Sequence, residues 1–162
     1  MILAKLKEAT KIQHQQLEMT VDVMNNALNL NDYEKLLRKF YGFYAPVEPQ
    51  IFSKINLRQI NFNYEERLKL PLLERDLQIL NGADFEVKTL EICGDTPDLS
   101  RFAQVIGCMY VLEGATLGGQ IIGRHLREKL NLSPANGAAF FNSYGERVGQ
   151  MWKSFVTMAA DQ

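Results

Sequence analysis

Residues 101–132 read RFAQVIGCMYVLEGATLGGQIIGRHLREKLNL, and this stretch decides the fold class. Apolar side chains recur in it at three- and four-residue spacing on both sides of a central glycine cluster, which is the period of a helix with a buried face. The alternating pattern of strands is nearly absent from this stretch and from the rest of the chain. The sequence therefore predicts an all-α fold whose long central helix bends at its glycines.

Helical periodicity continues on both sides of this stretch. We expect an N-terminal amphipathic helix over 2–18, a helix capped by Asn31, a helix within 63–82 that restarts near Pro71, and a final helix started by a capping box of Ser143 and Glu146. No internal repeat or low-complexity segment interrupts the pattern. Since a chain of 162 residues buries roughly two thirds of its unfolded surface, one domain over residues 1–162 is predicted.

The composition argues against several classes of function. The formal net charge of −1 and the lack of a long basic run disfavour a nucleic-acid partner. The sequence shows no run of about eighteen apolar residues and no signal peptide, so we expect a cytoplasmic protein with no membrane partner. The motifs of nucleotide binding, serine hydrolysis, zinc proteolysis and four-helix di-iron sites are absent as well.

Gly114, Gly118, Gly119 and Gly123 lie within the central helical stretch. Each glycine costs a helix about 1 kcal/mol relative to alanine unless packing returns that free energy. One explanation is close packing of helices, which the missing Cβ atoms allow. The other is a helix bent over a flat ligand, with its backbone exposed to that ligand. Three glycines within the six residues 114–119 favour the second explanation.

The chain contains two histidines, His14 and His125. Either one, taken alone, is more often a structural or surface residue than a metal ligand. His125 lies among charged residues, so we expect it to face outward. His14 follows Lys7 and Lys11 along one strip of the predicted first helix, an arrangement that could neutralise the carboxylates of a ligand held by the imidazole. A solvated helix face accounts for the same spacing, so spacing alone leaves both interpretations open.

Four separated blocks of the chain carry a family resemblance. They are LKEATKIQHQQLE at 6–18, YEKLLRKFYGFYAPVE at 33–48, YVLEGATLGGQIIGRHL at 110–126 and AAFFNSYGERVGQMWKSF at 138–155. In this order they resemble haem oxygenases, most specifically in KEATKxxH and EGxxLGGQ, and they lean toward the bacterial branch. The resemblance implies a single-domain helical bundle with a glycine-kinked distal helix. Family members usually continue into one more helix, which we expect to be absent from this sequence.

The resemblance assigns the first helix to the proximal side of the haem iron. The family's first-helix histidine ligates the iron, and the matching residue is His14. Glu18 matches an acidic residue near that ligand, where it would orient the imidazole. Lys7, seven residues before the histidine, and Lys153 in the last block would pair with the haem propionates.

The resemblance assigns the glycine block to the distal side. Gly114, Gly118 and Gly119 would let the distal helix lie against the porphyrin and the bound oxygen, and Tyr44 would lie near the distal water or the propionates. Mammalian members carry an aspartate after the first glycine of this block, where it organises distal water, but this chain has Ala115. Bacterial relatives also lack that aspartate, so the resemblance implies a different water-holding group.

The activity that the resemblance implies is oxidative cleavage of haem, as substrate and cofactor, to biliverdin, CO and iron. It requires O₂ and electrons from an external donor, a ferredoxin or a reductase, and a phytochrome is a further implied partner as bilin acceptor. Ala115 and the chain end at Gln162 motivate one alternative, a haem carrier or sensor without turnover. A second alternative is a helical protein that acts on another ligand or serves as a protein-interaction module.

Overall fold

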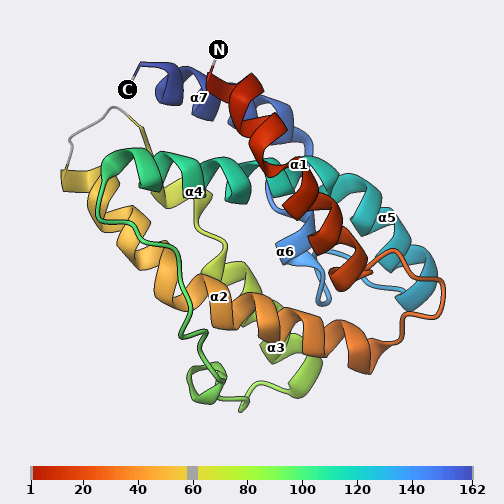
Figure 1. Ribbon diagram of the computed structural model, residues 1–162. Coiled ribbons are helices and arrows are strands. Elements are labelled where there is room, and N and C mark those ends of the chain that lie inside the picture. The colour runs from red at the N-terminus through yellow and green to blue at the C-terminus, as the bar shows by residue number, and fades with distance from the viewer. Residues whose placement is uncertain (1, 58–61, 162) are drawn as a thin grey trace.

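The computed structural model describes residues 2–57 and 62–161, the side chains of residues 2–4 and 57 excepted. Within these residues every regular element is helical, which confirms the predicted all-α fold (Figure 1). The α-helices are α1 (Ile2–Val21), α2 (Leu30–Leu57), α3 (Leu70–Asn81), α4 (Phe102–Ala115), α5 (Gly119–Leu130), α6 (Ala139–Asn142) and α7 (Val148–Ala160). Short 3₁₀ turns are η1 (Glu65–Arg67), η2 (Val87–Thr89), η3 (Thr116–Gly118) and η4 (Gly145–Arg147).

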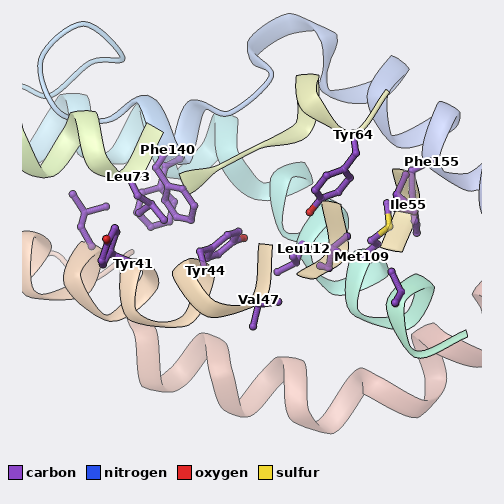
Figure 2. Close-up of a cluster of buried hydrophobic side chains, with 14 of the residues drawn as sticks. Tyr41, Tyr44, Val47, Ile55, Tyr64, Leu73, Met109, Leu112, Phe140 and Phe155 are labelled. Atoms are coloured by element: carbon purple, nitrogen blue, oxygen red, sulfur yellow. The ribbon is translucent and has the colours of Figure 1, made fainter. Parts of the chain in front are cut away.

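Helix α2 supplies the central face of the core. Its buried side chains recur at three- and four-residue intervals, so they form one stripe that faces the other helices. The stripe comprises Tyr33, Leu37, Tyr41, Tyr44, Glu48, Ile51 and Ile55. Figure 2 shows Tyr41 and Tyr44 beside Leu73 of α3 and Phe140 of α6, while Ile55 lies near Met109 of α4 and Phe155 of α7. Aromatic contacts join α2 to α6, with the Phe40 and Phe140 ring centroids 5.1 Å apart.

The central apolar stretch forms two helices rather than one. Helix α4 ends at Ala115, the turn η3 follows, and α5 begins at Gly119 and leaves the direction of α4 (Figure 1). By length and composition alone, Phe102–Leu130 is apolar enough to cross a membrane. In the fold, Val105 and Met109 of α4 are fully buried, as is Leu126 of α5. Part of the apolar character of this stretch therefore serves the protein core.

Gly119 explains why α5 can begin so close to α6. A Cβ atom at this position would overlap the carbonyl oxygen of Phe141, whereas a Cβ at Gly123 would meet no atom within 4 Å. Of the two explanations for the glycine cluster, close packing therefore accounts for Gly119.

Gly119→Ala is expected to lower the free energy of unfolding by about 1–3 kcal/mol, because the added methyl group overpacks the α5–α6 contact. Gly123→Ala is the matched control within α5, and it should raise stability by about 0.5–1 kcal/mol because alanine favours helix and finds open space. Urea unfolding followed by circular dichroism measures both changes. Equal effects of the two substitutions would contradict the packing role of Gly119.

Two buried carboxylates cap helices that lie far away in the sequence. Glu48 of α2 accepts hydrogen bonds from the backbone N–H groups of Lys69 and Leu70, at 2.7 and 2.8 Å, where α3 begins. Asp76 of α3 accepts from the N–H groups of Ala139 and Phe140, at 2.9 and 2.8 Å, where α6 begins. These bonds satisfy N–H groups that a helix leaves unpaired at its first turn. They fix the start of α3 against α2 and the start of α6 against α3.

Several local predictions need correction. Helix α2 is capped by Asn29, whose side-chain oxygen accepts from the N–H of Asp32 at 3.0 Å, and not by Asn31. No capping box of Ser143 and Glu146 starts the last helix, because Ser143 follows α6 with a φ of +47° and α7 begins only at Val148.

His125 is buried rather than outward-facing. The residue is 8% exposed, and its Nε2 lies 3.2 Å from the carbonyl oxygen of Asn25. This contact joins α5 to the segment between α1 and α2 and gives the residue a structural explanation.

Candidate functional site

A cavity of about 710 Å³ lies between α1 and the body of the protein. Its walls come from α1, α2, the α4–η3–α5 segment and α6, with Lys69 added from the start of α3. Ligand pockets for cofactor-sized molecules fall in the range of about 300–1,000 Å³. Apolar side chains dominate the walls, including Phe40, Phe140, Leu112 and Ile122. A large and mostly apolar ligand therefore suits this cavity.

His14 and Glu18 of α1 lie one helical turn apart on the cavity wall. Their side chains are 65% and 67% exposed, and His14 Nδ1 lies 3.5 Å from Glu18 Oε1. This separation exceeds an ordinary hydrogen bond but allows the carboxylate to orient the ring. No hydrogen bond and no other ion pair of the imidazole is found among the described residues, so Nε2 is free to bind a ligand. The geometry suits a histidine that presents one ring nitrogen to a metal.

The glycine segment forms another wall of the same cavity. Gly114, Ala115, Thr116 and Gly118 all line it, and a Cβ at Gly114 would lie 3.9 Å from the Trp152 ring. The Thr116 hydroxyl donates to the carbonyl oxygen of Glu113 at 2.7 Å and so is already engaged. The absence of side chains at two of these positions lets a flat ligand approach the backbone closely. Gly119, which packs against Phe141, is not among the lining residues.

Two hydroxyl groups belong to residues on the inner wall. Tyr44 of α2 is 4% exposed, and burial together with Glu48 and Glu113 raises the pKa of its phenol above the usual range. Its hydroxyl therefore stays protonated and can donate a hydrogen bond. Ser143 also lines the cavity, and within residues 2–57 and 62–161 its hydroxyl has no hydrogen-bond partner.

A cluster of buried charged groups adjoins the glycine wall. Arg67 of η1 donates to Glu113 Oε2 at 2.8 Å and to the carbonyl oxygen of Met151 at 3.2 Å. Tyr144 donates its hydroxyl to Glu113 Oε1 at 2.9 Å. Burial raises the pKa of Glu113, although Arg67 and Lys69 oppose that rise. Glu113 immediately precedes Gly114, so this network fixes the helix that carries the glycine wall.

Lys69 is the buried cation of this cluster that lies on the cavity wall. Its ammonium donates to the carbonyl oxygen of Arg67 at 2.7 Å and lies 3.6 Å from the centroid of the Tyr144 ring. Burial lowers the pKa of this lysine to about 8, while Glu113 and Glu48 oppose the decrease. Lys69 could not be identified from the sequence, because periodicity alone places it in an ordinary helical segment and the burial of a lysine is visible only in the fold.

The structure brings together some of the predicted site residues and not others. His14, Glu18, Tyr44, Gly114 and Gly118 line one cavity. Lys7 on α1 and Lys153 on α7 are exposed and do not belong to its lining.

In the described part of the chain, protein side chains alone form no site for a metal ion. Among those residues, no group of three or more His, Cys, Asp and Glu side chains could hold a metal ion.

Comparisons with known proteins identify the family to which the chain belongs. The family model described as Heme oxygenase matches residues 1–161. A curated relative, Heme oxygenase from Xanthomonas campestris pv. campestris (strain 8004), is 28% identical over 102 residues, which are 63% of this chain and 57% of the relative. The chain thus spans little more than half the length of that relative. No solved structure gave a significant match. Because the family model covers nearly the whole chain, this protein belongs to the heme oxygenase family.

Proposed function

We propose that the protein binds haem in the cavity between α1 and the α4–η3–α5 segment and cleaves it with O₂ to biliverdin, CO and iron. The observation that carries this proposal is that His14 and the glycine wall line the same cavity of about 710 Å³. The family membership supports it independently. Haem supplies the oxygen chemistry, and electrons come from an external donor such as a ferredoxin or a reductase.

In this proposal α1 holds the iron and orients its ligand. His14 Nε2 would coordinate the iron while Glu18 lies beside Nδ1, so the carboxylate would fix the plane of the ring. A neutral histidine leaves reduced haem able to bind O₂.

The opposite part of the cavity would shape the space in which the ring is attacked. Gly114 and Gly118 allow the backbone to lie near the porphyrin plane, which leaves limited room above it. Tyr44 contributes a protonated hydroxyl that can hold water, a role that Ala115 cannot fill. Apolar residues such as Leu112 and Phe140 exclude bulk water from the same space.

Hemin titration followed by reduction tests the proposal. Hemin added to the purified protein should produce a shifted Soret band, and a ferredoxin–reductase system or ascorbate with O₂ should then yield biliverdin. Failure to shift the Soret band would rule out haem binding. A stable ferrous complex that never yields bilin would instead support a haem carrier or sensor, the alternative that Ala115 motivates.

The cellular setting belongs to the same proposal. We place the protein in the cytoplasm, and a phytochrome is a candidate acceptor of the bilin product. Co-purification of biliverdin with such an acceptor, when the two are expressed together with a haem supply, tests this point.

A further inference from the structure

Lys69 is a buried cation on a ligand-cavity wall. The residue is 4% exposed, and it lines the cavity from the position just before α3. Lysine is almost never fully buried unless an anion pairs with it, because removing the ammonium from water is costly. A buried Lys69 ammonium therefore calls for an anionic partner.

The two nearest carboxylates are committed elsewhere. Glu48 uses both oxygens to accept from the backbone N–H groups of Lys69 and Leu70. Glu113 uses its oxygens to accept from Arg67 and Tyr144. Among the described residues, Arg67 forms the buried ion pair with Glu113, and no carboxylate oxygen lies within 4.0 Å of the Lys69 ammonium.

The contacts that Lys69 does make leave hydrogen-bond donors unused. Its ammonium has three N–H donors, of which one reaches the carbonyl oxygen of Arg67. The face of the Tyr144 ring attracts the positive charge but is a neutral group. Lys69 is thus a buried ammonium on a cavity wall whose direct contacts are neutral and whose donors are partly free, while Glu48 and Glu113 act on its charge without contacting it.

We propose that Lys69 binds a carboxylate of the haem that occupies this cavity, and so anchors one edge of the porphyrin. The inference rests on the proposed function, because haem carries two propionate carboxylates that require positive partners. Glu18 and Asp22 are exposed residues of the cavity lining and would repel such a carboxylate. Lys69 offers the opposite charge with desolvated donors, which makes the pairing strong.

A second anchor point has a consequence for the reaction. A porphyrin held through its iron by His14 alone can rotate about the iron–nitrogen bond. A carboxylate fixed at Lys69 removes that rotation and determines which meso carbon faces the glycine wall. Lys69 is therefore a positioning residue for the substrate, and its replacement should change the ratio of biliverdin isomers as well as the affinity.

A comparison of hemin with hemin dimethyl ester separates the carboxylate contact from the other contributions to binding affinity. The ester retains the iron and the ring but has no charged carboxylate. Trp152 is the chain's single tryptophan, and it lies next to Gly114 of the cavity wall, so quenching of its fluorescence reports binding. Both compounds are titrated into the wild type, Lys69→Met and Lys69→Arg. Lys129→Met is the matched control, because Lys129 is exposed in the last turn of α5 and does not line the cavity.

Lys69→Met should weaken hemin binding about tenfold to a hundredfold, the range for one hydrogen bond to a charged group. It should leave the affinity for the ester within about twofold, and Lys69→Arg should retain most of the hemin affinity. A loss of affinity that is equal for hemin and the ester would overturn the inference. So would a preference for hemin over the ester that disappears in Lys7→Met and persists in Lys69→Met. Absence of binding of either compound to the wild type would instead contradict the proposed function itself.

The pH dependence of the wild type provides a measurement that needs no variant. Lys69 faces Glu48 from α2, Glu113 from α4, Arg67 from η1 and the ring of Tyr144, and burial lowers its pKa to about 8. A bound carboxylate favours the charged ammonium, so it raises that pKa. The ratio of hemin affinity to ester affinity should be constant below pH 8 and fall above it, because protonation of the iron ligand affects both compounds alike. Parallel curves for the two compounds would contradict the carboxylate contact.

Discussion

His14→Ala is expected to weaken hemin binding by at least about a hundredfold and to abolish bilin formation. Loss of a residue that merely orients a metal ligand costs about 10–100-fold in metal affinity, so loss of the ligand itself should cost no less. The imidazole is the part of α1 best suited to bind iron, because Glu18 lies beside Nδ1 and Nε2 has no hydrogen bond or ion pair among the described residues. Soret titration measures the affinity, and the spectrum reports the coordination state.

The other histidine is the matched control. His125 is buried against the carbonyl oxygen of Asn25 and does not line the cavity, so His125→Ala should lower thermal stability but keep the Soret band. Added imidazole should restore a histidine-like spectrum to His14→Ala, because the empty position accepts a free ligand. Unchanged hemin affinity in His14→Ala would refute the assignment of the iron ligand.

The positions of the helices could be predicted because their periodicity is local. The stripe of α2 from Tyr33 to Ile55 repeats at three- and four-residue spacing, and the stop at Gly82 follows from a residue that accepts a φ of +101°. The caps of α3 and α6 could not be predicted from local sequence. Glu48 and Asp76 cap α3 and α6 from distant helices, and only the packed fold brings those carboxylates to the N–H groups.

The same distinction between local sequence signals and long-range contacts applies to the residues of the site. His14 and Gly114 belong to continuous motifs, so a family resemblance located them, and the structure places both on the cavity wall. Gly119 belongs to the same motif, yet its closest neighbour is the Phe141 carbonyl rather than the cavity. Lys69 carries no sequence signal, because nothing in its neighbours indicates that a lysine there is buried and lacks a carboxylate partner.

Glu113→Ala is expected to lower the free energy of unfolding by about 3–5 kcal/mol, the largest effect on stability predicted for this protein. The substitution removes the acceptor of both Arg67 and Tyr144 and leaves a buried guanidinium without a counter-charge. Because Glu113 precedes Gly114, the glycine wall should loosen as well. Urea unfolding measures the loss of stability, and hemin titration without denaturant measures the effect on the cavity.

An exposed ion pair near the same region is the control that separates the effect of burial on stability from the effect of charge. Glu66 and Arg147 lie 3.6 Å apart with side chains that are 49% and 59% exposed, so Glu66→Ala should cost about 1 kcal/mol or less. Burial raises the pKa of Glu113 in spite of Arg67, which means that the pair does not fully offset its own desolvation. Replacing both partners, as in Arg67→Met with Glu113→Leu, should therefore cost less than Glu113→Ala alone. If the double variant is instead the less stable one, the buried pair stabilises the fold by its attraction and not merely by avoiding an unpaired charge.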